Sequence, residues 1–356
     1  MRDGATPLHD APGALLPSSR GPLSAAVLAA FGSRPGDSVF SCIQESTADA
    51  LGEDLQLALQ LCYELHYQGF VGVDPDWEWD PELLRLRAGM ERAFLAALSD
   101  RSTGGADVAG ELDQLLVEPV PGVGVSHFLR DHGEWWQLKE YFVLRSIYHL
   151  KEADPHAWVI PRLRGRAKAA LVAVEFDEYG GGRAERAHTQ LFADLLTAAG
   201  LSSTYLHYLE QAPACALATV NMMSLFGLHR RLRGALVGHF AAAEISTAPS
   251  AQRMDQALAR LNAAGECRLF YTEHIEADAV HEQVIRHEVI EDLLDREPEM
   301  AQDVVFGIQA TELLEHRLSQ HLLDAWRAGE SALRTPLQAD RHGGRLADTP
   351  AAGIFA

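Results

Sequence analysis

Apolar residues recur at three- and four-residue spacing along most of this 356-residue chain, which is the pattern of amphipathic helices. Strict alternation of apolar and polar positions, the pattern of a half-buried strand, forms no convincing segment. We therefore expect an all-α fold. The predicted helices span residues 47–67, 81–98, 110–117, 134–152, 156–178, 183–199, 213–226, 232–245, 251–263, 267–294 and 297–327, and the fifth begins either at 156 with a kink or at Pro161.

Proline and glycine mark the breaks expected between these helices. Pro249 and the polar residues before it separate two helices, and the three consecutive glycines 180–182 end or distort another. The run from Ala212 to Leu228 is the longest weakly polar stretch, but Thr219, Asn221 and Ser224 interrupt it. We interpret it as a buried helix, because a membrane span needs about 20 predominantly apolar residues.

Composition divides the chain into four parts. Residues 1–36 mix Pro, Gly, Ser and Ala with little periodicity, and residues 329–356 have a similar composition, so both are predicted to be disordered tails. Between them we expect an N-terminal helical extension over residues 37–125 and a helical bundle over residues 126–328.

Charge and cysteine content exclude several classes of function. The formal net charge of -20 would repel a polyphosphate over most of the surface, so no nucleic-acid partner is expected. The four cysteines are scattered and form no CxxC pair, which is typical of reduced thiols in the cytosol. No secretion signal or long apolar run appears. We therefore expect a cytoplasmic protein that does not enter a membrane.

The strongest chemical signal is the trio His274, Asp278 and His281. Its members stand at offsets of four and seven residues, so they project from one face of a helix within roughly 60° of arc. Two imidazoles and a carboxylate on one stripe suit iron or zinc, and a site with positions left open for O2 favours Fe(II).

Other helices of a bundle must complete such a metal site, and the sequence offers candidates on each. Glu244 ends a small, apolar face, where a lone carboxylate would be costly without a cation beside it. Glu178 and His188 flank the triple glycine, which could bring them into line. Glu185 also stands three residues before His188, but Glu178 is preferred because it gives the glycines a purpose.

The helix over 134–152 should supply one more carboxylate. Position alone slightly favours Glu140 over Glu152, but the sequence by itself leaves this pair undecided. With that residue, Glu178, Glu244 and Asp278 would carry four negative charges, which balance two Fe(II) ions. His188, His274 and His281 would then be neutral donors. A pair of irons can take up O2 and share the electrons that its reduction needs, chemistry that side chains alone cannot perform.

These residues resemble the haem-oxygenase-like di-iron oxidases and oxygenases, also described as iron-containing redox enzymes. The resemblance rests on Asp177-Glu178-Tyr179-Gly180-Gly181-Gly182 followed by His188, then Glu244, then His274-x3-Asp278-x2-His281, and it extends over roughly residues 134–327. Residues 148–156 and 221–229 also look like family members, and because Glu152 lies in the first of these stretches, the resemblance favours Glu152 over Glu140.

The family implies a haem-oxygenase-like helical bundle that binds two Fe(II) ions rather than haem, with O2 as co-substrate. The implied metal ligands are Glu152, Glu178, His188, Glu244, His274, Asp278 and His281. The implied reactions are N-oxygenation, or oxidative cleavage or decarboxylation, of a small metabolite in specialised metabolism. The family also leads us to expect an external electron donor and a homodimer. Side chains around Tyr141, Leu144, Met222, Phe226 and Phe240 are expected to line the substrate pocket.

A second hypothesis treats the chain as a metal-free helical bundle that serves as an interaction or regulatory protein. In that case the face with His274, Asp278 and His281 would be solvated. The arrangement of Glu178, Glu244 and His274 in space separates the two hypotheses, because ligands of a dimetal centre must converge on ions about 4 Å apart.

Overall fold

The structure is a computed structural model and describes residues 13–36, 40, 48–118 and 120–337, apart from the side chains of residues 278 and 279. Every regular element among the described residues is helical, which confirms the predicted all-α fold class. The α-helices are α1 (Pro22–Phe31), α2 (Glu53–Glu64), α3 (Pro81–Ser99), α4 (Val108–Leu115), α5 (Val125–Asp131), α6 (Trp135–His149), α7 (Asp154–Ala157), α8 (Gly165–Glu178), α9 (His188–Ala198), α10 (Ala214–Leu228), α11 (Arg233–Arg260), α12 (Gly265–Val284), α13 (Glu291–Arg296) and α14 (Ala301–Arg327).

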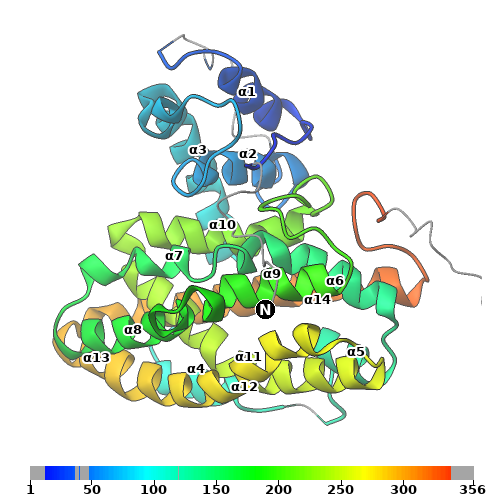
Figure 1. The fold of residues 1–356 in the computed structure, drawn as a ribbon. Helices are drawn as coiled ribbons and strands as arrows, with labels where there is room; N and C mark the ends of the chain where they lie inside the picture. Colours follow the sequence, from blue (N-terminus) through cyan, green and yellow to red (C-terminus); the bar gives the residue numbers. More distant parts are fainter. Residues whose placement is uncertain (1–12, 37–39, 41–47, 119, 338–356) are drawn as a thin grey trace, which may run out of the picture.

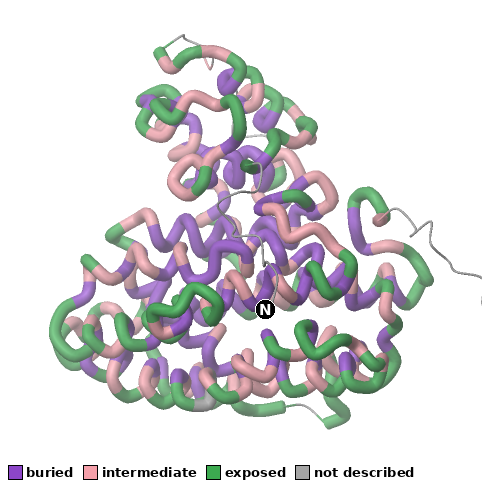
Figure 2. The backbone as a smooth tube through the Cα atoms, viewed as in Figure 1, coloured by how far each residue is buried: buried purple, intermediate pink, exposed green. Residues whose placement is uncertain are grey.

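The main bundle is built around α10, α11 and α14. Helix α11 packs against both α12 and α14, and α10 packs against α14 and α6 (Figure 1). Residues 216–227 of α10 are all buried, as expected for a helix that is apolar around its whole circumference. Buried residues run through the interior of the bundle, whereas exposed residues gather at its periphery (Figure 2). Within the described part of the chain, no helix is long and apolar enough to cross a membrane.

Helices α1, α2 and α3 form a cap on the bundle, with α2 against α10 (Figure 1). The prediction of a disordered tail over residues 1–36 is wrong for α1. Leu23, Val27 and Phe31 are buried, and the Asp54 carboxylate of α2 accepts hydrogen bonds from the backbone N–H groups of Leu23 and Ser24. The contact with α2 therefore stabilises a helix that is too short and too weakly patterned to form alone. Residues 1–12 lie outside the described part.

The prediction of a disordered C-terminal tail over residues 329–356 is also wrong at its start. Ala332 and Leu333 are buried, and the backbone N–H of Ala332 donates a hydrogen bond to Glu140. Residues 338–356 lie outside the described part. The boundary expected near residue 126, between extension and bundle, stays a prediction.

Helix α11 runs through Pro249, where the sequence pattern predicted a break between two helices. A proline inside a helix removes one hydrogen bond and costs about 3 kcal/mol. The packing of α11 against α12 and α14 offsets this cost. Helix α12 likewise continues through a π-helical turn, Ile285–Ile290, into α13, within the single helix predicted over residues 267–294.

Candidate metal centre

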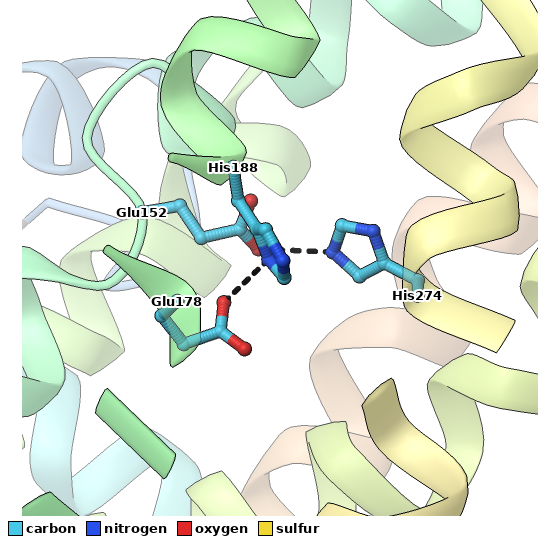
Figure 3. Close-up of side chains that lie close together, drawn as sticks. All are labelled: Glu152, Glu178, His188 and His274. Atoms are coloured by element: carbon cyan, nitrogen blue, oxygen red, sulfur yellow. Dashed lines mark ion pairs between the residues drawn. The ribbon is translucent and has the colours of Figure 1, made fainter. Parts of the chain in front are cut away.

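Six of the seven ligand residues implied by the resemblance converge in the middle of the bundle. One group contains Glu152, Glu178, His188 and His274, and a second contains Glu178, Glu244 and His281. In each group the ligand atoms lie within 4.8 Å of one another, and every member is buried. Figure 3 shows the first group, in which His274 projects from α12 toward the side chains of Glu152, Glu178 and His188. Glu178 belongs to both groups and therefore links them.

The triple glycine brings Glu178 and His188 together. Gly180, Gly181 and Gly182 adopt positive φ angles of 72°, 62° and 79°, a conformation that side chains disfavour. A Cβ atom on Gly180 would also meet the backbone of residues 186 and 187. The chain thus ends α8 at Glu178, folds back on itself and begins α9 at His188 rather than at residue 183. As a result, His188 Nδ1 lies 2.7 Å from Glu178 Oε2.

The ring of His274 is oriented by its own helix. Its Nδ1 lies 2.7 Å from the carbonyl oxygen of Phe270, one turn earlier, and a carbonyl can only accept a hydrogen bond. Nδ1 therefore carries the proton, and Nε2, which lies 3.9 Å from Glu152 Oε1, has the lone pair that a metal needs. The ring centroids of His274 and His188 are 4.3 Å apart, and Phe270 packs against His274.

The second group is held by His281. Its Nδ1 lies 3.0 Å from Glu244 Oε2 and 3.6 Å from Glu178 Oε1, while its Nε2 lies 3.3 Å from Asp177 Oδ2. Asp177 itself is mostly exposed. This contact can hold the ring of His281 in its orientation.

The structure separates the alternatives that the sequence left open. Glu140 is outside both groups, because its carboxylate accepts hydrogen bonds from Trp326 Nε1 at 2.9 Å and from the backbone of Ala332 at 3.0 Å. Glu185 is exposed in a short 3-10 turn and is also outside both groups. Asp278 lies within α12, but its side chain is not among those described, so its role as a ligand stays a prediction.

Negative charge accumulates at this centre. Burial, together with the charges of Glu178 and Glu244, raises the pKa of Glu175 to about 9, and neither of its carboxyl oxygens has a hydrogen-bond partner among the described residues. Burial also raises the pKa of Glu244, and repulsion by Glu178 adds to this although the hydrogen bond with His281 opposes it. Burial disfavours a charged His281, yet Glu244 and Glu178 raise its pKa to about 9. Crowded carboxylates that draw protons to themselves are the surroundings expected for bound cations.

His149 belongs to neither group but contacts Glu152, a role that the sequence did not reveal. Its Nδ1 lies 3.0 Å from Glu152 Oε2, and its ring packs between Phe192 and Phe270, with centroids 4.8 Å and 5.1 Å away. The only available signal was its position three residues before Glu152, which many surface histidines share by chance.

A cavity of about 830 Å³ reaches the centre, a size suited to a small molecule. Glu152, Glu178, Glu244 and His274 form part of its wall. Of the side chains expected to line a substrate pocket, Tyr141 and Phe240 line this cavity, whereas Leu144, Met222 and Phe226 are not part of its wall.

Comparison with known proteins agrees with this arrangement. The model of a family described as iron-containing redox enzymes matches residues 139–316, which hold all the residues of both groups. The chain is also similar to a nitrosourea synthase of Streptomyces achromogenes subsp. streptozoticus, with 26% identity over 238 residues, or 65% of this chain and 50% of that protein. The chain thus spans about half the length of this curated relative. With its all-α bundle and a family match that includes every residue brought together at the centre, the chain belongs to the iron-containing redox enzymes of the haem-oxygenase-like family.

Proposed function

We propose that the protein is a non-haem di-iron oxidase or oxygenase that uses O2 to oxidise a small metabolite. The observation that supports this most directly is the position of Glu178, whose carboxylate is shared by two buried groups of histidine and carboxylate donors. A carboxylate between two such groups can bridge two metal ions about 4 Å apart. This convergence argues against a metal-free interaction protein, because several carboxylates buried together without a cation cost free energy.

The residues would divide as follows. Glu152, His188 and His274 would hold one ion, Glu244 and His281 the other, and Glu178 both. We propose Asp278 as a further ligand on the strength of its spacing in α12. Two ferrous ions held there would supply the site for O2 and part of the electrons for its reduction, and an external donor would supply any others.

Residues around the centre orient the proposed ligands. Phe270 fixes the tautomer of His274 through its carbonyl oxygen, His149 orients Glu152, and Asp177 orients His281. Phe192 and Phe270 pack against each other beside the centre, where Phe270 contacts the ring of His274 and Phe192 that of His149. The cavity places a substrate beside the side chains of Glu152, Glu178 and Glu244.

The similarity to a nitrosourea synthase favours nitrogen as the atom that is oxidised. N-oxygenation is therefore our preferred reaction, ahead of oxidative cleavage of a carbon–carbon bond. Neither the substrate nor the product of that relative is transferred to this chain.

Anaerobic titration with Fe(II), followed by optical spectroscopy after the addition of O2, tests the proposal. We expect two irons per chain and a transient absorption. Glu178→Ala should bind less than two irons, whereas Glu185→Ala, a carboxylate that is exposed and outside both groups, should bind two as the unaltered chain does. A wild-type stoichiometry of one iron or fewer, or equal behaviour of the two variants, would argue against a di-iron centre.

A further inference from the structure

The cavity beside the metal centre contains a histidine to which the proposed function assigns no role. His239 lies in α11, is 1% exposed and lines the cavity. Its ring centroid is 5.2 Å from that of His156, another buried residue of the same wall. The Nε2 atom of His239 has no hydrogen-bond partner among the residues that the structure describes.

Close packing of two helices sets the position of this ring. Helices α11 and α14 approach each other at Gly238 and Gly307, where a Cβ atom would collide with the carbonyl of Val304 or Ala235 on the opposite helix. Only glycine permits this approach. The crossing presses His239 against Thr311, which lies one turn beyond Gly307 on α14.

The contact with Thr311 determines which nitrogen of His239 carries the proton. His239 Nδ1 lies 2.8 Å from Thr311 Oγ1, and the same hydroxyl donates a hydrogen bond to the carbonyl of Gly307 at 2.7 Å. A threonine hydroxyl has one hydrogen, so it can only accept from His239. Nδ1 is therefore the protonated nitrogen, and Nε2 is an acceptor with a lone pair. Burial lowers the pKa of His239 to about 4, which keeps the ring neutral at physiological pH.

Two charged side chains of the cavity wall already pair with each other. Arg145 and Glu315, both in the cavity wall, form a two-point ion pair with N to O distances of 2.9 Å and 2.6 Å. His239 Nε2, in contrast, has no hydrogen-bond partner among the described residues. A buried acceptor left without a donor costs about 1 to 3 kcal/mol. A group that donates a hydrogen bond from inside the cavity would remove this cost.

We propose that His239 Nε2 is a recognition point for the substrate and accepts a hydrogen bond from one of its N–H or O–H groups. This inference rests on the proposed function, because it takes the cavity to be the substrate pocket. A molecule whose one polar group is a carboxylate has no hydrogen to donate at neutral pH. The subsite therefore selects amines, amidines, guanidines or alcohols over molecules of the fatty-acid type.

The first test is the tautomer, which needs no substrate. Nuclear magnetic resonance of the full chain labelled with ¹⁵N-histidine, with His239→Asn to assign the signal, should show a protonated Nδ1 and an unprotonated Nε2. Thr311→Val removes the acceptor and should abolish this preference while the helical circular dichroism is retained. A protonated Nε2 in the unaltered chain would overturn the inference.

The second test is the binding of small probes to the Fe(II)-loaded chain without O2, measured by calorimetry. Methylguanidine and butylamine test N–H donors, butanol tests an O–H donor, and hexanoate tests a carboxylate. We expect the donor probes to bind more tightly than hexanoate and to lose about tenfold in affinity in His239→Asn, which keeps a donor for Thr311 but has no atom in the place of Nε2. His239→Gln, whose amide oxygen can take that place, should retain more of the affinity.

The results separate this inference from the proposed function. Unchanged donor affinity in His239→Asn, hexanoate binding that matches the donors, or no donor binding by the unaltered chain would each refute the subsite, even with two irons bound. A chain that binds no iron but shows the expected tautomer and donor-selective binding would refute the di-iron proposal and leave the subsite standing. If His239→Asn loses affinity only for butylamine and methylguanidine, the donor recognised is N–H. If it loses affinity only for butanol, the donor is O–H.

Discussion

The cap and the bundle are joined by a buried ion pair whose disruption should be costly. Lys151 Nζ lies 2.9 Å from Glu64 Oε2, and both side chains are 0% exposed. Tyr205 donates a hydrogen bond of 2.6 Å to the other oxygen of Glu64, and Lys151 Nζ lies 4.2 Å from the ring centroid of Tyr67. Because Lys151 immediately precedes Glu152, the pair also anchors the segment that carries a proposed ligand.

Removing one charge from this pair leaves the other buried and uncompensated, which typically costs about 3 to 5 kcal/mol. We expect Lys151→Met and Glu64→Gln each to lower the free energy of unfolding by about that amount, a large part of the roughly 5 to 15 kcal/mol of an ordinary domain. The double variant should lose clearly less than the sum, because it leaves no lone charge, with a coupling of about 2 kcal/mol or more.

Urea unfolding followed by circular dichroism measures these values. Arg85→Met, which removes an exposed ion pair with Glu82 on α3, is the matched control and should leave the unfolding curve unchanged. The reasoning is refuted if Lys151→Met costs less than about 1 kcal/mol or if the two single costs simply add.

Three further predictions follow from individual contacts. Gly238→Ala should lower the free energy of unfolding by about 1 to 3 kcal/mol or more, measured in urea, since its Cβ atom would collide with the backbone of α14. Because the folded pKa of His239, about 4, lies below the unfolded value near 6.5, the unfolded chain takes up the proton first as the pH falls. Titration of His239 should therefore lower the free energy of unfolding by about 2 kcal/mol as the pH falls from ~7.5 to ~5, and His239→Gln should lack this loss. The same pH dependence of stability in the variant and the unaltered chain would contradict a buried, neutral His239. Glu140→Ala should destabilise the chain yet retain two irons, whereas Glu152→Ala should lose iron; the opposite result, read by metal analysis, would restore Glu140 as the ligand.

Local sequence patterns were sufficient for most of the helices and pointed to most of the residues that meet at the centre, whereas Glu152 was preferred over Glu140 only through the family resemblance. His274 and His281 stand out because helical spacing places them on one face, and Glu178 and His188 because three glycines between them mark a sharp reversal. Burial of Glu244 followed from its small, apolar neighbours. Each of these signals lies within a short segment of the chain, so it can be recognised in the sequence without knowledge of the fold.

The features that sequence reasoning missed depend on contacts between distant segments. Helix α1 forms because Asp54 and the apolar surface of α2 stabilise it, and α11 continues through Pro249 because the helix as a whole packs against α12 and α14. The orientation of His239 depends on where α11 crosses α14. No pattern within either helix specifies that crossing, so the cavity and its acceptor become visible only in the folded chain.

Anomalous X-ray diffraction at the iron absorption edge, from crystals grown anaerobically with Fe(II), tests the central claim most directly. The account predicts two peaks about 4 Å apart on either side of the Glu178 carboxylate, one near His188 and His274 and the other near Glu244 and His281. A single peak, or peaks away from Glu178, would contradict it.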